Sequence, residues 1–434
     1  MPMFNRGYLA NSSLQEKVAI IGCGESAKVF AEWSEVEHFD VFTTLGGGQF
    51  RDKDVLAVET LREPNDYLQI IIANQYVDEI LEQWVNDNKS LQNVFWFDFM
   101  NLKLAQVDSL SYTQSAKDSS LHVIYDLHVL PATFDIAAFL VRAELRRIEL
   151  GLDNINLIII GGNFGGVSAR ACLNHGSEQG TWRIQNVLIP MSQMLKRCRG
   201  VSFIPNKKCL SDLTQGEATF PQDLSARPDF RFYALAPLQK RFESGADIQV
   251  LESPMQAKEY ARQFLKSHGI SKQFITISLR EYTHQASRNS CIECYQYLAE
   301  RVLNLGLGIV LIRDTNKALE QKLNWEGTVE CPVASFNVAI RMALYESAFM
   351  NISVSSGPSF GLMLLSRHCD FLMTHLVDNS QVVSSEAFLK ERQGISVGEQ
   401  FPFCGRFQRV CWTEDAEEIA NEFELMIKEK LSIN

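Results

Sequence analysis

The sequence predicts an α/β protein in which two Rossmann-like halves follow a small N-terminal Rossmann-like domain, and three observations support this fold class. Short apolar runs, such as residues 18–21, 155–160 and 274–279, have the length and continuity of strands buried on both faces of a parallel sheet. Segments with helical periodicity alternate with these runs along the chain. At 434 residues the chain is also too long for one ordinary core.

The composition excludes several classes of protein. Hydrophobic residues make up 46% and charged residues 21%, the balance of a globular protein. A net charge of −11 argues against nucleic acid as a partner, although a few local arginines can still hold a diphosphate. The ten cysteines are scattered, which predicts reduced thiols and a cytoplasmic protein. No apolar run is long enough to span a bilayer, so membrane contact would be peripheral docking.

The N-terminal domain is expected over residues 17–105, after a polar, flexible N-terminus at 1–16. Its expected strands and helices alternate, and they are the strands 18–21, 39–43, 67–73 and 93–97 and the helices 26–33 and 76–85. Residues 106–120 are rich in Ser, Asp and Thr without periodicity and are expected to form a linker.

The remainder is expected to form two halves, over residues 121–250 and 251–434. The first should contain the strands 122–127, 155–160 and 201–204, the helix 134–150 and a segment 182–188 of undecided type. The second should contain the strands 274–279, 309–312, 351–354 and 370–373 and the helices 254–268, 292–305, 335–347, 360–367 and 414–430.

Polar residues follow several strands of the last half. Arg280 and Glu281 end one strand, Asp314 another, and a small-residue turn, Ser355, Ser356, Gly357, Pro358 and Ser359, follows a third. Ligands of open parallel sheets bind outside the carboxyl ends of the strands, and a helix start favours phosphate. Arg288 and Asn289 would add contacts to the same anion. The alternative is that the turn only starts a helix.

The segments 277–281, 288–290, 343–348 and 351–358 resemble the donor-binding half of GT-B glycosyltransferases, closest to heptosyltransferase-like enzymes of bacterial surface-polysaccharide synthesis. Residues 125–135 and 161–166 are similar to the first half of these enzymes, and the resemblance covers about residues 120–430. It implies a nucleotide-sugar donor, with Glu346 at the base or ribose and Ser356 and Gly357 at the diphosphate. The Lys-bearing diphosphate motif of the family is not evident, so arginines would replace it.

The resemblance also implies a general base in the first half, at Asp126, His128 or Asp135. Such a base takes a proton from a sugar hydroxyl and must be a carboxylate or an imidazole in the cleft. Asp135 could instead cap the following helix, and His128 could be structural. No metal or other cofactor is expected to be obligatory, because arginines can neutralise the leaving diphosphate.

A glycine turn in the N-terminal domain follows the first expected strand. Gly22, Gly24 and Ser26 form part of a dinucleotide-binding pattern, but Thr43 stands near the place of the usual acidic residue, which weakens NAD binding. The domain resembles the N-terminal domain of sugar acetyltransferases of the PglD kind, where such a turn meets a nucleotide sugar. A domain without a ligand is the alternative. Cys291 and Cys294 form a lone C-x-x-C motif, too few ligands for zinc.

The function expected is therefore transfer of a sugar from a nucleotide-sugar donor to a polysaccharide, lipid-linked or protein acceptor. One alternative is an NAD(P)-dependent oxidoreductase that uses the N-terminal glycine turn. Another is a non-catalytic nucleotide-sugar-binding protein of GT-B shape. The donor sugar, the base, the acceptor and the oligomeric state are not determined by these patterns.

Overall fold

The computed structural model divides into two compact units, residues 1–118 and 119–434, and each is described by itself. The structure describes residues 17–61, 67–74, 76–87, 89–99, 102–107, 119–161, 177–210, 214, 218–222, 234–270, 273–283, 285–320, 322–374, 377–380 and 384–433. The polar N-terminus, most of the expected linker and the glycines at 162–166 lie outside these ranges.

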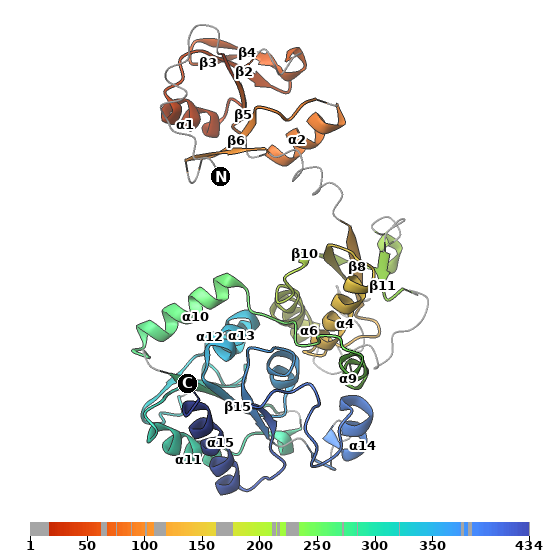
Figure 1. Cartoon of the computed structure of the whole chain (residues 1–434), viewed down its shortest axis with the longest axis vertical. Coiled ribbons are helices and arrows are strands. Elements are labelled where there is room, and N and C mark those ends of the chain that lie inside the picture. The colour runs from red at the N-terminus through yellow and green to blue at the C-terminus, as the bar shows by residue number, and fades with distance from the viewer. Residues whose placement is uncertain are drawn as a thin grey trace. The chain divides into compact units, whose positions relative to one another are not determined.

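The first unit is built on one seven-stranded sheet in the order β3-β4-β2-β1-β5-β6-β7 (Figure 1). Its strands are β1 (Val18–Ile21), β2 (Phe39–Thr43), β3 (Gln49–Phe50), β4 (Lys53–Ala57), β5 (Gln69–Ile72), β6 (Val94–Asp98) and β7 (Lys103–Gln106). The helical elements are α1 (Glu25–Ser34), η2 (Val58–Thr60) and α2 (Val77–Asn86). The five inner strands are parallel, and β3 and β7 join the two edges antiparallel.

Both faces of this sheet are buried at its centre, where β1 is apolar at every position and β5 at all but its first. Val18 and Ile20 of β1 pack into one core with α1, whereas Ala19 and Ile21 pack into another with α2. The predicted strands and helices are confirmed to within two residues. The sequence analysis missed β3, β4 and β7, of which β3 and β4 form a hairpin after the glycine run 46–48.

The first half of the second unit has a parallel sheet in the order β10-β9-β8-β11. Its strands are β8 (Ser120–Asp126), β9 (Asn154–Ile160), β10 (Cys198–Ile204) and β11 (Ala218–Phe220). The helical elements are α4 (Ile136–Glu149), α6 (Ser177–Arg183), η4 (Ile184–Leu188), α7 (Ile189–Ser192), η5 (Lys207–Cys209) and α9 (Ala236–Glu243). The undecided segment 182–188 is helical, with a π-helical turn at η4.

The second half has a six-stranded parallel sheet in the order β14-β13-β12-β15-β16-β17. Its strands are β12 (Phe274–Ser278), β13 (Gly308–Ile312), β14 (Thr328–Glu330), β15 (Met350–Val354), β16 (Phe371–Thr374) and β17 (Gln408–Val410). The helical elements are α10 (Met255–Ser267), η7 (Ala286–Arg288), α11 (Ile292–Leu303), α12 (Val333–Phe336), α13 (Val338–Ser347), η8 (Ser359–Met363), α14 (Glu386–Phe388), η10 (Leu389–Gln393) and α15 (Ala416–Leu431).

This strand order is that of a Rossmann sheet, in which the order reverses between β12 and β15. Figure 1 shows α11 and α15 next to each other beside the sheet, and they share one hydrophobic core with it. Helix α13 packs into the other core, which continues into α4 and β8 of the first half. One core therefore runs through both halves of the second unit. The prediction of Rossmann-like units is confirmed by these sheet orders.

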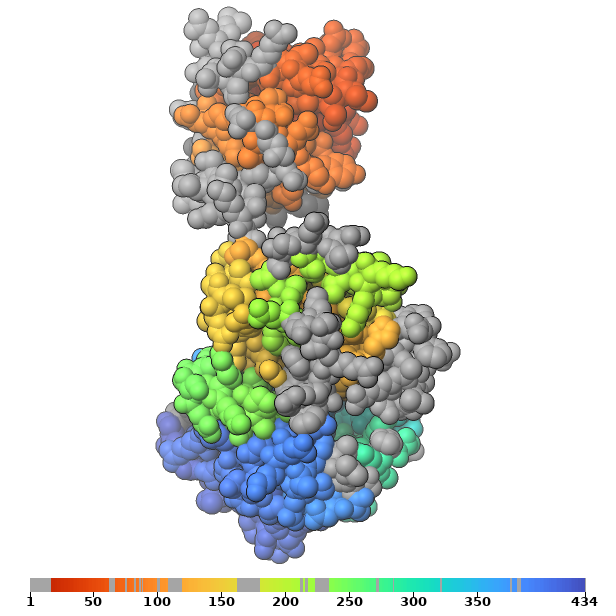
Figure 2. All heavy atoms as spheres, turned by 90° about the vertical axis from the view of Figure 1, so that its right-hand side faces the viewer, coloured from red at the N-terminus to blue at the C-terminus, as the bar shows by residue number. Residues whose placement is uncertain are grey.

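The connecting segment around residues 251–253, between the two halves, is hydrogen-bonded to both of them. Leu251 donates its backbone N–H to Leu365 O of the second half at 3.1 Å, and Glu252 donates to Met194 O of the first at 3.0 Å. In Figure 2 residues coloured green lie between the yellow residues of the first half and the blue residues of the second. Among the described residues, no helix has the length and apolar character needed to cross a membrane.

Candidate functional site

A cavity of about 880 Å³ lies at the carboxyl ends of the six-stranded sheet. The second half contributes residues that follow β12, β13, β14 and β15, where the strand order reverses. Helix α4, the loop before it and helix α6 contribute the opposite side, which includes Phe134, Asp135 and Arg183. Open α/β sheets bind their ligands at such a reversal point. Two Rossmann-like halves that line one cavity are the GT-B arrangement predicted from the sequence, and this fold class is confirmed.

Arg280 enters the cavity directly after β12 and is held by its own loop. Its backbone N–H donates to Ser290 Oγ at 2.9 Å, and its guanidinium donates to Gln285 O at 3.0 Å and to Asn289 Oδ1. Burial lowers the pKa of Arg280, and the charge of Asp314 opposes this shift. Asn289 does not line the cavity, so its predicted contact with an anion becomes the positioning of Arg280.

Arg288 lies in the same cavity and is more strongly desolvated. Its terminal nitrogens donate to Gln285 Oε1 at 2.9 Å and to Ser355 O at 3.3 Å, and its Nε has no hydrogen-bond partner among the described residues. Burial, followed by the charge of Arg280, lowers the pKa of Arg288 to about 10. Two neighbouring guanidinium groups that are both desolvated create a strong local preference for an anion.

The turn after β15 offers a phosphate fewer hydrogen-bond donors than the sequence indicates. Ser356 donates its backbone N–H to Ser359 Oγ at 2.7 Å, and Pro358 has no N–H. Ser359 is fully buried and donates to Val354 O at 3.1 Å, so its hydroxyl holds the turn together. Of the five residues of the turn, Ser356, Gly357 and Pro358 line the cavity, whereas Ser355 and Ser359 do not.

Gly357 is a glycine because of a neighbour in the first half. A Cβ atom at Gly357 would lie 2.7 Å from Cδ2 of Phe134, and one at Gly361 would lie 3.1 Å from the Cβ of Phe134. The resemblance placed Gly357 at the diphosphate, where a small residue would leave room for phosphate oxygens. The structure shows instead that the space is taken by the aromatic side chain of Phe134.

Asp314 and Glu281 have different roles although both follow strands. Asp314 is the second residue after β13, and it lines the cavity. Glu281 does not line it, because its carboxylate accepts two hydrogen bonds from Arg313 at 2.9 and 2.6 Å. Both side chains of this pair are largely buried. Glu281 therefore stabilises the ends of β12 and β13.

The three predicted bases are separated by the structure. Asp126 is buried at the end of β8, where it pairs with Lys207 Nζ at 2.8 Å and contacts His128 Nδ1 at 2.8 Å. Burial would raise the pKa of Asp126, but the hydrogen bonds of Lys207 and His128 outweigh it and hold the pKa below its usual value. Neither Asp126 nor His128 lines the cavity.

Asp135 is the predicted base that does line the cavity. It precedes α4, and its side chain makes no cap hydrogen bond to that helix. Its Oδ2 instead accepts a hydrogen bond from Thr133 Oγ1 at 2.6 Å. Asp135 is exposed, and it stands on the cavity wall directly before α4.

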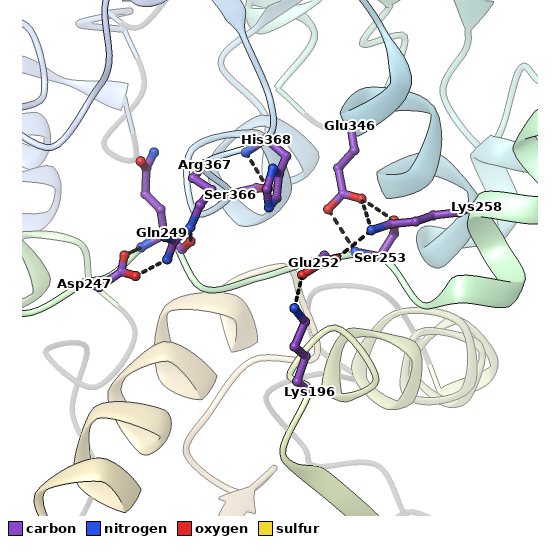
Figure 3. A network of polar contacts seen from close by, with 10 residues as sticks. All are labelled: Lys196, Asp247, Gln249, Glu252, Ser253, Lys258, Glu346, Ser366, Arg367 and His368. Atoms are coloured by element: carbon purple, nitrogen blue, oxygen red, sulfur yellow. Dashed lines mark hydrogen bonds and ion pairs between the residues drawn. The ribbon is translucent and has the colours of Figure 1, made fainter. Parts of the chain in front are cut away.

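Glu346 was predicted at the base or ribose, but its carboxylate points to the segment between the halves (Figure 3). It accepts hydrogen bonds from Ser253, at 2.9 Å from the backbone N–H and also from the hydroxyl, and lies 3.5 Å from Lys258. Lys258 also donates to Glu252 at 2.7 Å. Glu346 does not line the cavity. Its role in the structure is to hold the connecting segment against α13.

Two arginines of the cavity were missed by the sequence analysis. Arg183 ends α6 and Arg341 lies on α13, and neither follows a strand directly. The available signal for Arg341 is a single charge within residues 338–345, which are all buried in the helix. Helical periodicity alone does not show that this charge faces a cavity, because the cavity is formed only when α13 packs against the sheet.

The glycine turn of the first unit has a structural explanation. Gly22 has a φ of +126°, and a Cβ there would lie 2.5 Å from Ala73 O of the neighbouring strand end. Gly24 caps α1, with open space where a Cβ would be, and Ser26 is half-buried within the helix. Close packing of β1 and β5 therefore accounts for Gly22 without a ligand.

The cysteine expectation is wrong at one place, because Cys291 and Cys294 form a disulfide at the start of α11. The seven other described cysteines are free. Within the described ranges, no group of three or more His, Cys, Asp or Glu side chains could hold a metal ion.

The sequence matches no protein-family model, and no curated protein matches it either. Solved structures are similar at low identity. A glycosyl transferase family 9 protein from Veillonella parvula has 12% identity and a TM-score of 0.43, over 72% of this chain and 98% of that chain. Escherichia coli heptosyltransferase WaaC with ADP has 11% identity and a TM-score of 0.36, over 72% of this chain and 99% of that chain. Likeness at this level leaves the ligand to be inferred from the cavity itself.

Proposed function

We propose that the second unit binds a nucleotide sugar and transfers its sugar to a hydroxyl group of a glycan, lipid-linked or protein acceptor. The observation that carries the proposal is the charge of the cavity. Among the described residues that line it, the cationic ones are the four arginines Arg183, Arg280, Arg288 and Arg341, and the acidic ones are Asp135 and Asp314. The cavity is therefore net positive in a chain whose net charge is −11, which favours a dianionic ligand.

A diphosphate is the anion that fits the reversal point best. Arg280 and Arg288 come from one loop after β12, and Arg288 also contacts the end of β15. An arginine fork can bind two phosphate oxygens at once, and the desolvated pair would regain solvation from the anion. Ser356 and Gly357 would border the same phosphates. The charge of Asp314 acts on Arg280. The carboxylate of Asp314 would accept a hydrogen bond from a ribose hydroxyl of the donor.

Asp135 is the proposed general base. It would take the proton of the acceptor hydroxyl while that oxygen bonds to the anomeric carbon of the donor sugar. The bond from this carbon to the diphosphate oxygen breaks at the same time, and the electron pair leaves with the diphosphate. Arg280 and Arg288 would stabilise that leaving charge. Asp126 is a poorer candidate, since its pKa is lowered and its side chain is buried outside the cavity.

The first unit has no assigned part in this reaction. Its predicted likeness to PglD-type domains stays a prediction, and so does the cytoplasmic location. The oxidoreductase alternative has little support, because the geometry of Gly22 is explained by packing against Ala73. The non-catalytic binding protein remains the second candidate, and the substitution of Asp135 described below separates it from a transferase.

Calorimetric titration of the full chain with nucleoside diphosphates tests the binding step. We expect Arg288→Gln to lower the affinity about tenfold to a hundredfold, since a hydrogen bond to a charged group contributes about 1.5–3 kcal/mol. Arg262→Gln is the matched control, because Arg262 lies on α10, pairs with Glu259 and is outside the cavity. If no nucleoside diphosphate binds, or if both variants bind equally well, the proposed site is wrong.

A further inference from the structure

Arg341 is a buried cation with an unmet hydrogen-bonding need. It lies on α13, only 7% of it is exposed, and it lines the cavity. One terminal nitrogen donates to Arg313 O at 3.3 Å, and Nε has no hydrogen-bond partner among the described residues. Buried polar groups of native proteins are nearly always satisfied, so a bound ligand is expected to supply an acceptor here.

The place of Arg341 separates it from the proposed diphosphate site. Arg313, to which Arg341 is bonded, directly follows β13, whereas Ser355, to which Arg288 is bonded, directly follows β15. Strand β12 lies between these two strands. Neighbouring strands are about 4.8 Å apart, so the two contact points are separated by about 10 Å. A diphosphate bound at Arg288 would be too short to span this distance, whereas the nucleoside attached to it would be long enough.

The surroundings of Arg341 suit a flat, partly polar ring. Val338 and Ala334 line the cavity beside it and offer apolar contact. The hydroxyl of Ser335 donates to Arg313 O at 2.7 Å, and that of Thr315 donates to Ser335 O at 3.0 Å. Both hydroxyl protons are thus committed to the backbone, so the guanidinium of Arg341 is the charged donor toward a ligand in this part of the cavity.

We infer that Arg341 reads the nucleobase of the donor and selects a base that carries a carbonyl oxygen, guanine or a pyrimidine, over adenine. This inference rests on the proposed function. A guanidinium only donates hydrogen bonds, and guanine presents two adjacent acceptors, O6 and N7, to its fork. Adenine places an amino group, a donor, where guanine places O6. The fork would keep N7 as an acceptor, but its other N–H would face the amino group of adenine, so two donors would oppose each other at that position.

The experiment compares ADP, GDP, UDP and CDP by calorimetric titration of the full chain. We expect at least one of the carbonyl-bearing diphosphates to bind at least tenfold tighter than ADP. Arg341→Met should lower the affinity for that preferred diphosphate about tenfold or more and lower the affinity for ADP by a clearly smaller factor. Arg341→Lys keeps the charge but lacks the guanidinium fork. Its affinity for the preferred diphosphate should lie between those of the unaltered protein and Arg341→Met.

Failure of this inference can be distinguished from failure of the proposed function. If ADP binds as tightly as the others while Arg288→Gln weakens all four, the base selection is wrong and the diphosphate site stands. If Arg341→Met weakens all four equally, Arg341 acts on the diphosphate and the inference is overturned. If no diphosphate binds, both proposals fail. Should the Arg341 variants not fold, the ranking of guanosine, uridine, cytidine and adenosine on the unaltered protein decides the inference.

Discussion

Phe134 of the first half lies against the Cα atom of Gly357 in the second, so closely that a Cβ at Gly357 would be 2.7 Å from Cδ2 of Phe134. The contact joins the loop before α4, which presents Asp135, to the turn after β15, which borders the proposed diphosphate. The spacing of these two site elements is therefore set by one glycine and one aromatic ring.

Gly357→Ala is expected to disturb this contact. Overpacking of a buried contact costs about 1–3 kcal/mol, and the displaced Phe134 would move Asp135 with it. We expect a lower midpoint of urea unfolding and reduced transfer activity. Gly405→Ala is the control, because the nearest atom to a Cβ there is 3.9 Å away. Phe134→Leu combined with Gly357→Ala should recover stability, and a double variant no more stable than Gly357→Ala alone would show that the ring is not the obstacle.

Asp135→Asn tests the proposed base. Because the amide cannot accept the proton, the turnover of a nucleotide-sugar donor should fall about 10²- to 10⁴-fold while diphosphate affinity stays the same. Asp126→Asn is the comparison, since Asp126 is buried against Lys207 and outside the cavity. That variant should be less stable by about 1–3 kcal/mol and otherwise retain turnover per folded molecule. Unchanged turnover in Asp135→Asn would favour the non-catalytic binding protein or another base.

Glu252 should make the stability of the second unit depend on pH. Hydrogen bonds from Lys196 and Lys258 lower the pKa of Glu252 to about 2 (Figure 3). A folded-state pKa below the unfolded value means that the stabilisation is present above about pH 4.5 and is lost as the pH falls toward 2. We expect Glu252→Gln to be less stable by about 1 kcal/mol at pH 7, and the difference to shrink at pH 3.

Glu259→Gln is the control for this measurement. Glu259 pairs with Arg262 one turn away on the surface of α10, where solvent screens the interaction, so little change in stability is expected at either pH. A difference between Glu252→Gln and the unaltered protein that is as large at pH 3 as at pH 7 would contradict the ion-pair explanation.

Gly22→Ala tests whether the glycine turn of the first unit is structural. The positive φ and the 2.5 Å approach to Ala73 O should make this variant less stable by about 1–3 kcal/mol. Gly24→Ala has open space and should be nearly neutral. Differential scanning calorimetry would report both effects. If Gly24→Ala abolished the binding of a nucleotide without loss of stability, the turn would instead be a ligand-binding site.

The sequence alone determined the α/β class, the alternation of strands and helices and most element positions, because these depend on local apolar runs and helical periodicity. It also placed Arg280, Arg288 and Asp314 near one sheet edge, since residues after parallel strands meet there. Short edge strands such as β3, β7 and β14 escaped detection, because two to four residues carry too little periodicity.

Only the tertiary structure decided which polar side chain faces the cavity and which is paired elsewhere. Glu281 and Arg313 form a pair across neighbouring strand ends, and Glu346 binds Ser253, which lies 93 positions away in the sequence. Arg341 is placed in the cavity by the packing of α13, not by a strand end. Partners brought together by folding are distant in the chain, and no local pattern of residues reveals which of them will meet.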